Sequence, residues 1–216
     1  MARVVKKPEE RKEELLEIAL KLFLQKGYEN TSIKDIYTEA NGSFGMFYHH
    51  FKSKEEIFAL SMDKYVNIFI DRLVDALLDD AIPYEQRYNK AIIRLIEFLN
   101  GRDKVIGYER GDLDVSVFRL LSLKILGESV NIVQLFLEEG SKKGLLQVEN
   151  VHQSAIIITY GIYGVIREEG LRMSNNKNAL SVLSNLSTQI ANLVNSDKAL
   201  FEVRVDGEKM EGKENA

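Results

Sequence analysis

The sequence contains no cysteine and no tryptophan, and it has only three histidines and two prolines. Without cysteine, disulfide bonds and thiolate metal sites are excluded. The small number of prolines and the scarcity of strand-like alternation between apolar and polar residues favour an all-α fold. The missing thiols also suit the reducing cytoplasm, which is where we expect the protein to act.

Signals for membranes and for catalysis are also scarce. No run approaches the ~20 apolar residues that a membrane-spanning helix needs, and the amino terminus lacks the apolar core of a signal peptide. The sequence has no glycine-rich phosphate loop, no His-Glu-x-x-His and no Gly-x-Ser-x-Gly motif. His152 stands alone, whereas His49 and His50 share one short segment. We expect a soluble protein that is not an enzyme, with no cofactor, no metal site and no membrane partner.

The size and charge of the chain limit the number of domains and the kind of DNA binding that can be expected. The 216 residues, 45% of them hydrophobic, suffice for one or two well-packed domains. The chain carries a net charge of −4, but residues 1–55 hold ten Lys and Arg against nine Asp and Glu and are nearly neutral. Because DNA affinity depends on local phosphate contacts, this balance allows a modest DNA footprint and argues against indiscriminate binding.

The segment from Ser32 to Lys54 is the most informative part of the sequence. It begins with a short predicted helix whose apolar residues recur at helical spacing, namely Ile33, Ile36, Tyr37 and Ala40. Ser32 can cap this helix together with Asp35, three residues further on. Asn41 and Gly42 then supply a turn, because both tolerate positive φ.

A second short helix is predicted after the turn. Ser43 can cap it, and Phe47 and Phe51 can bury inward from it. Its other face does not need to be buried and includes Gly45 and Tyr48. A glycine within a helix costs about 0.5–1 kcal/mol relative to alanine, so Gly45 either permits close approach of another surface or is a plain surface glycine. Two short helices joined in this way predict a helix-turn-helix, whose second helix is free to enter a DNA major groove.

A supporting helix precedes this unit. Pro8 suits a first helical turn, and Gly27 is the expected residue just past the helix end. The apolar stripe between them consists of Leu15, Ile18, Ala19, Leu22 and Phe23. Three helices within about fifty residues make a compact module with its own small core.

Residues 10–58 resemble the DNA-binding domain of the TetR family of bacterial and archaeal transcriptional regulators. The matching positions are Ala19, Leu22, Phe23, Gly27, Tyr28, Thr31, Ser32, Ile33, Ile36, Ala40, Ser43, Gly45, Phe47, Tyr48, His50, Phe51, Ser53, Lys54 and Glu55. The resemblance implies an all-helical homodimer that binds an operator and releases it when a small molecule binds the second domain.

The resemblance also implies roles for single residues. In the family, the residues matched by Tyr48 and Lys54 contact phosphates, and Thr31 or Ser32 touches the other flank of the site. The predicted DNA-contacting residues are Thr31, Ser32, Lys34, Ser43, Phe44, Gly45, Met46, Tyr48, His49, His50 and Lys54.

Three positions depart from the family pattern. Gly42 replaces a common apolar residue, Phe44 a polar or basic one, and Met46 a small hydroxyl residue. Neither Phe44 nor Met46 can donate bidentate hydrogen bonds to guanine or adenine, but both can pack on thymine methyl groups. They therefore predict an operator that leans towards A·T pairs and is read partly through DNA shape. The alternative is that Phe44, in helical register with Phe51, lies in the domain core.

The rest of the chain is predicted to form longer helices. Residues 1–53 are expected to be the DNA-binding domain, 54–196 a helical ligand-binding and dimerisation domain, and 197–216 a charged, mostly disordered tail, with a short extended segment at Phe201–Val205 as an alternative. The first long helix is expected from Lys54 to about Asp80. The stretch from Val151 to Arg167 is nearly all apolar and is expected to be buried on most sides.

Two further surfaces are predicted in the second domain. An apolar effector pocket is expected to draw on Met62, Tyr65, Phe69, Phe98, Tyr108, Phe118, Arg119, Tyr160 and Arg167, although an ordinary core with surface arginines is an alternative. A four-helix dimer interface is expected to use Ser154, Ala155, Gly161, Gly164, Leu183, Leu186, Ile190 and Leu193. Alternatively, these helices fill the core of their own domain.

The function expected from the sequence is a ligand-responsive regulator, most simply a repressor. Its expected partners are palindromic operator DNA, a second copy of the chain and a hydrophobic small-molecule effector. Half-sites are expected about one helical turn, roughly 34 Å, apart or somewhat more. The alternative is a helical protein-interaction module that has lost DNA binding.

Overall fold

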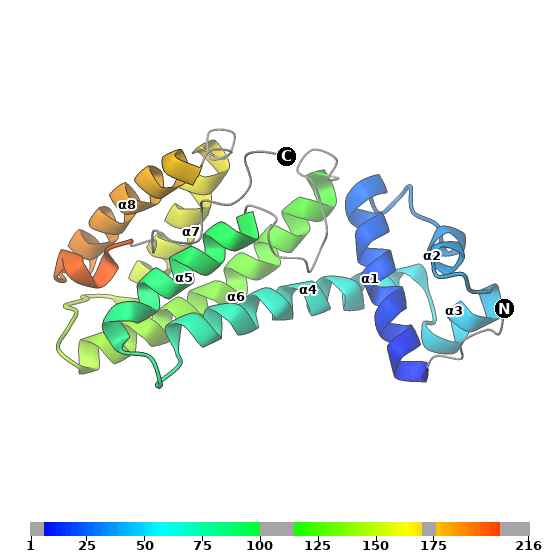
Figure 1. Cartoon of the computed structure of the whole chain (residues 1–216), viewed down its shortest axis with the longest axis horizontal. Helices are drawn as coiled ribbons and strands as arrows, with labels where there is room; N and C mark the ends of the chain where they lie inside the picture. The colour runs from blue at the N-terminus through cyan, green and yellow to red at the C-terminus, as the bar shows by residue number, and fades with distance from the viewer. Residues whose placement is uncertain (1–6, 100–114, 170–175, 204–216) are drawn as a thin grey trace, which may run out of the picture. The chain divides into compact units, whose positions relative to one another are not determined.

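The structure, a computed structural model, describes residues 7–99, 115–169 and 176–203 (Figure 1). These residues form eight α-helices and a short 3-10 helix, η1, and contain no strand, which confirms the all-α fold. The helices are α1 (Pro8–Lys26), α2 (Ile33–Glu39), α3 (Phe44–His50), α4 (Lys54–Leu77), α5 (Tyr84–Leu99), α6 (Val115–Lys142), α7 (Val151–Glu169), α8 (Asn176–Leu193) and η1 (Lys198–Phe201).

Local sequence signals account for the ends of α1. Pro8 occupies its first turn with Glu9 and Glu10, where acidic side chains complement the helix dipole. Gly27 ends the helix at φ 83°, a conformation that favours glycine, and its N–H donates to the Phe23 carbonyl. The helix thus begins and ends where the sequence predicts.

The described residues divide into two compact units. The first unit contains α1, α2, α3, the part of α4 up to Ile70 and the part of α6 up to Ile125. The second contains the rest of α4 and α6 together with α5, α7, α8 and η1. The boundary expected between residues 53 and 54 is therefore not where compactness changes, because α4 and α6 each contribute residues to both units.

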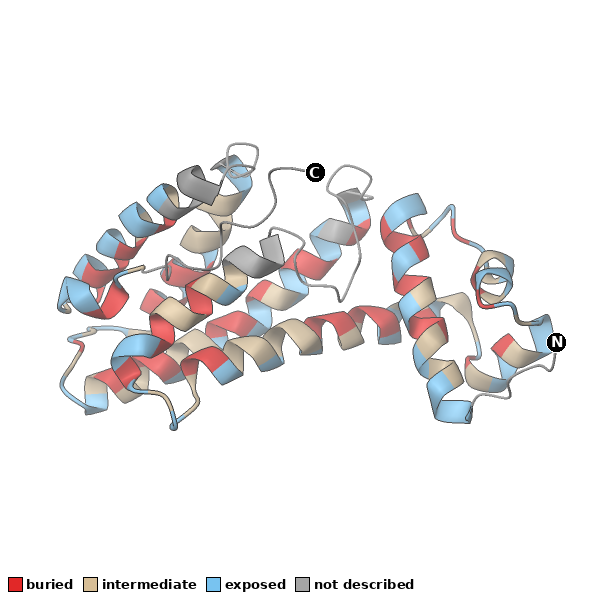
Figure 2. Ribbon diagram, viewed as in Figure 1, coloured by how far each residue is buried: buried red, intermediate tan, exposed pale blue. Residues whose placement is uncertain are grey.

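The second unit has a continuous core built from one side of each of its helices. Figure 2 shows buried residues recurring along α5, with exposed positions between them. The Tyr84 ring stacks on Phe136 at 4.5 Å between ring centroids, and its hydroxyl donates to the Phe136 carbonyl. Gly140 fits beside this pair only as glycine, because an added Cβ would lie 2.1 Å from the Tyr84 oxygen.

A buried arginine joins α5 to its neighbours in the second unit. The Arg87 side chain is 2% exposed and donates to the Ile82 carbonyl at 2.9 Å, to Glu139 at 2.8 Å and to Asp80 at 3.2 Å. Buried charge is tolerated only when it is paired in this way. The hydrogen bond with Lys143 and the nearby Arg87 hold the pKa of Glu139 below its usual value.

The predicted disorder of residues 197–216 is wrong for the part of this segment that the structure describes. Asp197 caps η1, and Leu200 and Phe201 are buried. The Phe201 ring meets Tyr88 edge-on, with ring centroids 4.8 Å apart. The signal was local, since a capping residue precedes two large apolar side chains; residues 204–216 lie outside the described ranges.

One other expectation also fails. The expectation that Val151–Arg167 is buried on most sides is wrong, because Ile156, Ile157 and Tyr160 of α7 are exposed. One segment of α6, Arg119–Lys142, is long and apolar enough by length and composition to cross a membrane, a test that the core helix of a soluble protein also passes. A short segment around Lys104–Tyr108, which the sequence pattern separates from the longer helices, lies outside the described residues.

Candidate nucleic-acid interface

The first three helices are tied together by polar contacts as well as by their core. Arg11 on α1 donates to the carbonyl of Ala40, at the end of α2, over 3.0 Å and pairs with Glu14 at 2.6 Å. The Thr31 hydroxyl, just before α2, lies 2.8 Å from the Gly27 carbonyl and 3.1 Å from the Leu22 carbonyl. These contacts fix the position of α2 relative to α1.

The burial of Thr31 corrects one sequence prediction. Its side chain is buried and its hydroxyl is directed at main-chain oxygens of its own domain, so it does not offer the predicted DNA contact. Ser32, its neighbour, is exposed and remains on the surface. A buried threonine satisfies its hydroxyl inside the protein because an unpaired one would be costly.

The start of α2 is a reciprocal cap. The Asp35 N–H donates to the Ser32 hydroxyl at 3.1 Å, and the Asp35 carboxylate accepts from the Ser32 N–H at 2.8 Å. The hydrogen bond from the Ser32 main chain, followed by that from its hydroxyl, lowers the pKa of Asp35. The predicted capping box is confirmed, and it sets the first residue of the helix-turn-helix.

The turn between α2 and α3 explains two departures from the family pattern. Asn41 has a φ of 50°, and the Gly42 N–H donates to the Tyr37 carbonyl at 2.7 Å. A Cβ added to Gly42 would lie 2.1 Å from the Met46 methyl carbon and 2.7 Å from its sulfur. The small residue at 42 therefore makes room for the large one at 46, and Met46 lies back over the turn, half-buried, rather than fully on the outer face.

The outer face of α3 consists of four exposed residues, Phe44, Gly45, Tyr48 and His49. Phe47, on the opposite face, is fully buried, as is Phe51 at the helix end, which confirms the predicted inward positions. Phe44 is 63% exposed, so the alternative that it lies in the core is wrong. A Cβ added to Gly45 would meet no atom within 4 Å, and the space above that residue is open.

Phe44 and Tyr48 form an exposed aromatic pair. Their ring centroids lie 4.5 Å apart with the rings tilted by 46°. Tyr48 also meets the buried Phe47 edge-on at 5.3 Å. Because Phe47 is fixed in the core, the two outer rings are held in place through a chain of aromatic contacts.

The two histidines lie at the end of α3 and differ in exposure. His49 is exposed and His50 is half-buried, with ring centroids 5.0 Å apart. Burial, followed by the neighbouring His49, lowers the pKa of His50. His49 is therefore the more accessible histidine of the pair.

Lys54 is held at the start of α4 by Tyr28. Its ammonium lies 4.2 Å from the centroid of the Tyr28 ring, a cation–π distance. The Tyr28 hydroxyl donates to Glu55 at 2.9 Å, which fixes the ring. Tyr28 belongs to the matched sequence pattern, but no positioning role was predicted for it; its place directly after Gly27 was the available signal.

Most of the predicted DNA contacts are thus accessible. The exposed ones are Ser32, Lys34, Ser43, Phe44, Gly45, Tyr48 and His49, and the half-buried ones are Met46, His50 and Lys54. Ser43 accepts a hydrogen bond from the Met46 N–H, so it caps α3 as well. Sequence reasoning missed Arg11, whose bond to Ala40 joins residues far apart in the chain and leaves no local pattern.

The predicted dimer residues divide between core and surface. Ser154, Ala155, Leu183 and Ile190 are buried in their own chain, which favours the alternative that they serve its core. Gly161 and Gly164 are partly exposed, and an added Cβ would meet nothing within 4 Å at either. Leu186 is half-buried and packs against the core, and Leu193 is exposed. The exposed Ile157 and Tyr160 on α7 were not among the predicted dimer residues.

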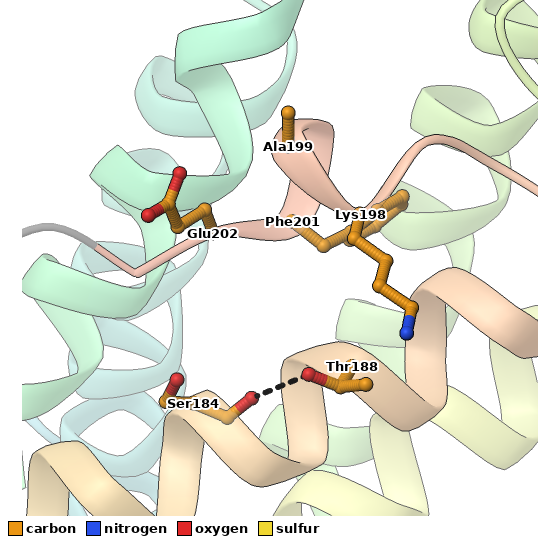
Figure 3. Close-up of a pocket in the computed structure, with 6 residues that line it drawn as sticks. All are labelled: Ser184, Thr188, Lys198, Ala199, Phe201 and Glu202. Carbon is orange, nitrogen blue, oxygen red and sulfur yellow. Dashed lines mark hydrogen bonds between the residues drawn. The ribbon is translucent and has the colours of Figure 1, made fainter.

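The predicted effector pocket is not assembled from its whole residue set. Met62 and Tyr65 are buried and Phe69 is half-buried, whereas Arg119, Tyr160 and Arg167 are exposed. Tyr108 and the side chains of Phe98 and Phe118 lie outside the described residues. Figure 3 shows a different site, a shallow depression of about 220 Å³ between α8 and η1 that is lined by Ser184, Thr188, Lys198, Ala199, Phe201 and Glu202.

Known proteins resemble this chain in sequence and in fold. Residues 15–60 match the family described as bacterial regulatory proteins, tetR family. The HTH-type transcriptional repressor DhaR of Mycobacterium sp. (strain GP1) is 28% identical over 139 residues, which cover 63% of this chain and 70% of DhaR. The uncharacterized HTH-type regulator YerO of Bacillus subtilis (strain 168) is 25% identical over 70% of this chain, and the match spans only 47% of YerO.

A solved structure extends the similarity to the whole fold. The reduced form of E. coli NemR superposes with a TM-score of 0.62 at 18% identity and covers 87% of this chain and 96% of its own. At that identity the likeness shows the fold alone. The helix order beyond residue 60 is thus shared with known proteins even where the sequence is not.

Proposed function

Because this chain belongs to the TetR family of helix-turn-helix transcriptional regulators, we propose that it represses transcription in the cytoplasm by binding an operator as a homodimer. A small-molecule effector releases the DNA. The main support for a DNA-binding role is the accessible outer face of α3, which is formed by Phe44, Gly45, Tyr48 and His49. The opposite side of this helix is held in the domain core by the buried Phe47. A fixed, exposed second helix is the element that a helix-turn-helix inserts into the major groove.

Phosphate contacts flank this face in the proposal. The Tyr48 hydroxyl donates to one phosphate, and the Lys54 ammonium, which Tyr28 positions, pairs with another. Lys34 and Ser32, at the start of α2, add contacts on the other flank. Few cations are involved, which agrees with the nearly neutral charge of this part of the chain and predicts a modest dependence of affinity on salt.

Dimerisation uses the outer face of α7 in this proposal. Ile157 is 55% and Tyr160 is 46% exposed; Gly161 and Gly164 lie about one and two turns after Ile157, and Gly164 lies about one turn after Tyr160. The glycines leave open space into which a partner helix can approach closely. One seven-residue recognition helix offers little affinity, and two-fold symmetry doubles its contacts across a palindrome.

The effector is expected to act through helices that reach the DNA-binding module. In the first unit, Asp63 of α4 pairs with Lys124 of α6, and the adjacent Lys64 pairs with Glu13 and Glu17 of α1. Although partial burial opposes it, hydrogen bonding to the two glutamates raises the pKa of Lys64. A shift of α6 is thereby passed to α1 through two neighbouring residues of α4.

An effector must bind the DNA-incompetent conformation more tightly than the DNA-binding conformation, because only a difference in affinity shifts the equilibrium between the two conformations. The Thr159 hydroxyl of α7 is buried and has no hydrogen-bond partner within the described ranges. A buried hydroxyl without a partner is costly, so it is a candidate to bond a ligand in the second unit. Met62, Tyr65 and Phe69 remain candidates for an apolar contact in the first.

The test of the proposed function is DNA selection followed by a matched set of variants. The full-length protein is expected to enrich a palindromic sequence from random duplexes. A Tyr48→Phe, Lys54→Ala variant is expected to lose this binding while keeping its circular dichroism spectrum. Failure of the wild-type protein to enrich any sequence would contradict the proposal and favour a protein-interaction role.

A further inference from the structure

Phe44 is the most exposed large hydrophobic side chain among the described residues, at 63%. It is not an isolated surface residue, because its ring contacts Tyr48 at 4.5 Å and Tyr48 contacts the buried Phe47. The pair therefore presents a fixed aromatic surface to solvent. Such a surface is costly to leave exposed unless a partner covers it in use.

The surroundings of Phe44 leave few polar groups for reading bases. Gly45 has no side chain, and Met46 lies back over Gly42. The Ser43 hydroxyl accepts the Met46 N–H as the cap of α3. Of the four outer-face residues, only His49 and the Tyr48 hydroxyl can form hydrogen bonds, and both lie towards the far end of the helix. The amino-terminal end is apolar.

That end is the one that reaches the bases. In a helix-turn-helix, the amino-terminal residues of the recognition helix contact base edges in the major groove. The apolar group that a base pair presents there is the C5-methyl of thymine, whereas guanine, cytosine and adenine present hydrogen-bonding groups. An aromatic side chain at the first position of α3 therefore matches thymine.

We propose that Phe44, held against Tyr48, is a specificity-determining residue that packs on the C5-methyl group of one thymine in each operator half-site. The inference rests on the proposed function, in which α3 enters the major groove. Tyr48 has two tasks in it: its ring supports Phe44, and its hydroxyl reaches the phosphate.

The test removes only the methyl group. After selection of an operator by the full-length protein, each thymine is replaced in turn by deoxyuridine, which keeps base pairing and lacks the C5-methyl. Loss of one buried methyl is expected to weaken binding about fourfold, and loss of the equivalent methyl from both half-sites about 15-fold. The effect should be confined to one thymine per half-site.

Two variants assign the effect to its residue. Phe44→Ala is expected to bind the thymine and deoxyuridine operators with equal affinity, and its exposed position means that thermal stability should not fall. Leu60→Ala, which removes another exposed apolar side chain in the same unit, is expected to keep the full discrimination.

Three results would overturn the inference while leaving the regulator function intact. The wild-type protein could bind all deoxyuridine operators as tightly as the thymine operator, Phe44→Ala could keep the same discrimination, or the selected half-sites could contain no thymine. Failure to enrich any sequence is a different result, because it removes the proposed function and the inference together.

Discussion

Two helices of this protein, α3 and α7, leave an apolar face uncovered, and they do so in a similar way. On α3, the exposed rings of Phe44 and Tyr48 lie beside Gly45, above which space is open. On α7, the exposed Ile157 and Tyr160 lie beside Gly161. Each face combines large apolar side chains with a glycine that its own chain does not require for packing.

The two faces differ in length and in what surrounds them. The seven-residue α3 is capped and is fixed through Phe47, and its face includes a histidine and lies near Lys54 in sequence. The nineteen-residue α7 packs Ala155 and Ile158 into the core of the second unit and exposes Ile156, Ile157 and Tyr160 along its middle, with polar side chains exposed towards its two ends. A short face with polar neighbours suits a DNA groove, and a longer aliphatic face suits another helix.

The largest expected effect comes from placing a charge on each face. Ile157→Glu buries an unpaired charge in the proposed interface, so it should yield a monomer in sedimentation experiments and weaken operator binding on the order of 100-fold. Phe44→Glu should abolish operator binding and leave the dimer intact. A Gln86→Glu change on an exposed position of α5 serves as the control for added charge.

Two opposite outcomes would contradict the assignment of the α7 face to dimerisation and of the α3 face to DNA binding. A dimeric Ile157→Glu protein with normal DNA binding would show that the α7 face is not the interface. A monomeric Phe44→Glu protein would show that α3, and not α7, carries self-association.

Adding one methyl group beside each face tests whether the glycines serve a partner. Gly45→Ala should weaken operator binding at least about fivefold through crowding at the interface. Within its own chain the change is accommodated, since an added Cβ meets nothing within 4 Å. Alanine also favours the helix, so the melting temperature should stay the same or rise by about 2 °C.

Gly161→Ala is the matched change on α7. It should weaken dimerisation, measured by sedimentation, without lowering the stability of the protomer. If Gly45→Ala leaves operator binding unchanged, or Gly161→Ala leaves dimerisation unchanged, the glycine concerned is a plain surface residue.

A smaller effect is expected at the turn before α3. Gly42→Ala forces the end of the flexible Met46 side chain to move, which should cost about 1 kcal/mol of unfolding free energy. The Gly42→Ala, Met46→Ala protein should regain part of this loss in urea denaturation, because the two residues share one space. If the losses of unfolding free energy from the two substitutions simply added, residues 42 and 46 would not share one space.

The features predicted well from the sequence are those that depend on neighbouring residues. The Ser32–Asp35 cap, the Gly27 helix end and the inward positions of Phe47 and Phe51 follow from local spacing, and the structure contains them. The burial of Thr31 could not be predicted from local spacing, because its hydroxyl is directed at the carbonyl of Leu22, which lies in α1.

The same reasoning could not separate core from interface in the second unit. Ala155 and Ile157 are both apolar residues of an apolar helix, and periodicity does not say which side faces the chain's own core. The structure buries the first and exposes the second. The packing of Phe201 on Tyr88 could not be predicted either, because the two residues lie far apart in the sequence, although the Asp197 cap just before η1 is a local signal.

The smallest expected effect concerns acid. Hydrogen bonds in the folded state lower the pKa of Asp35, so its carboxylate stabilises the fold above its unfolded pKa, and this contribution is lost as pH falls through the folded value. Asp35→Asn should therefore reduce the urea midpoint at pH 7 and flatten its decline below pH ~4. Glu29→Gln, which removes an exposed carboxylate from the same region, should change neither.

The most direct test of the central claim, that two copies of the α3 face read one operator, is a hydroxyl-radical footprint of the full-length protein on its selected operator. We predict two protected patches related by two-fold symmetry and separated by about one helical turn, roughly 34 Å, or somewhat more. A single protected patch, or protection without symmetry, would contradict the account.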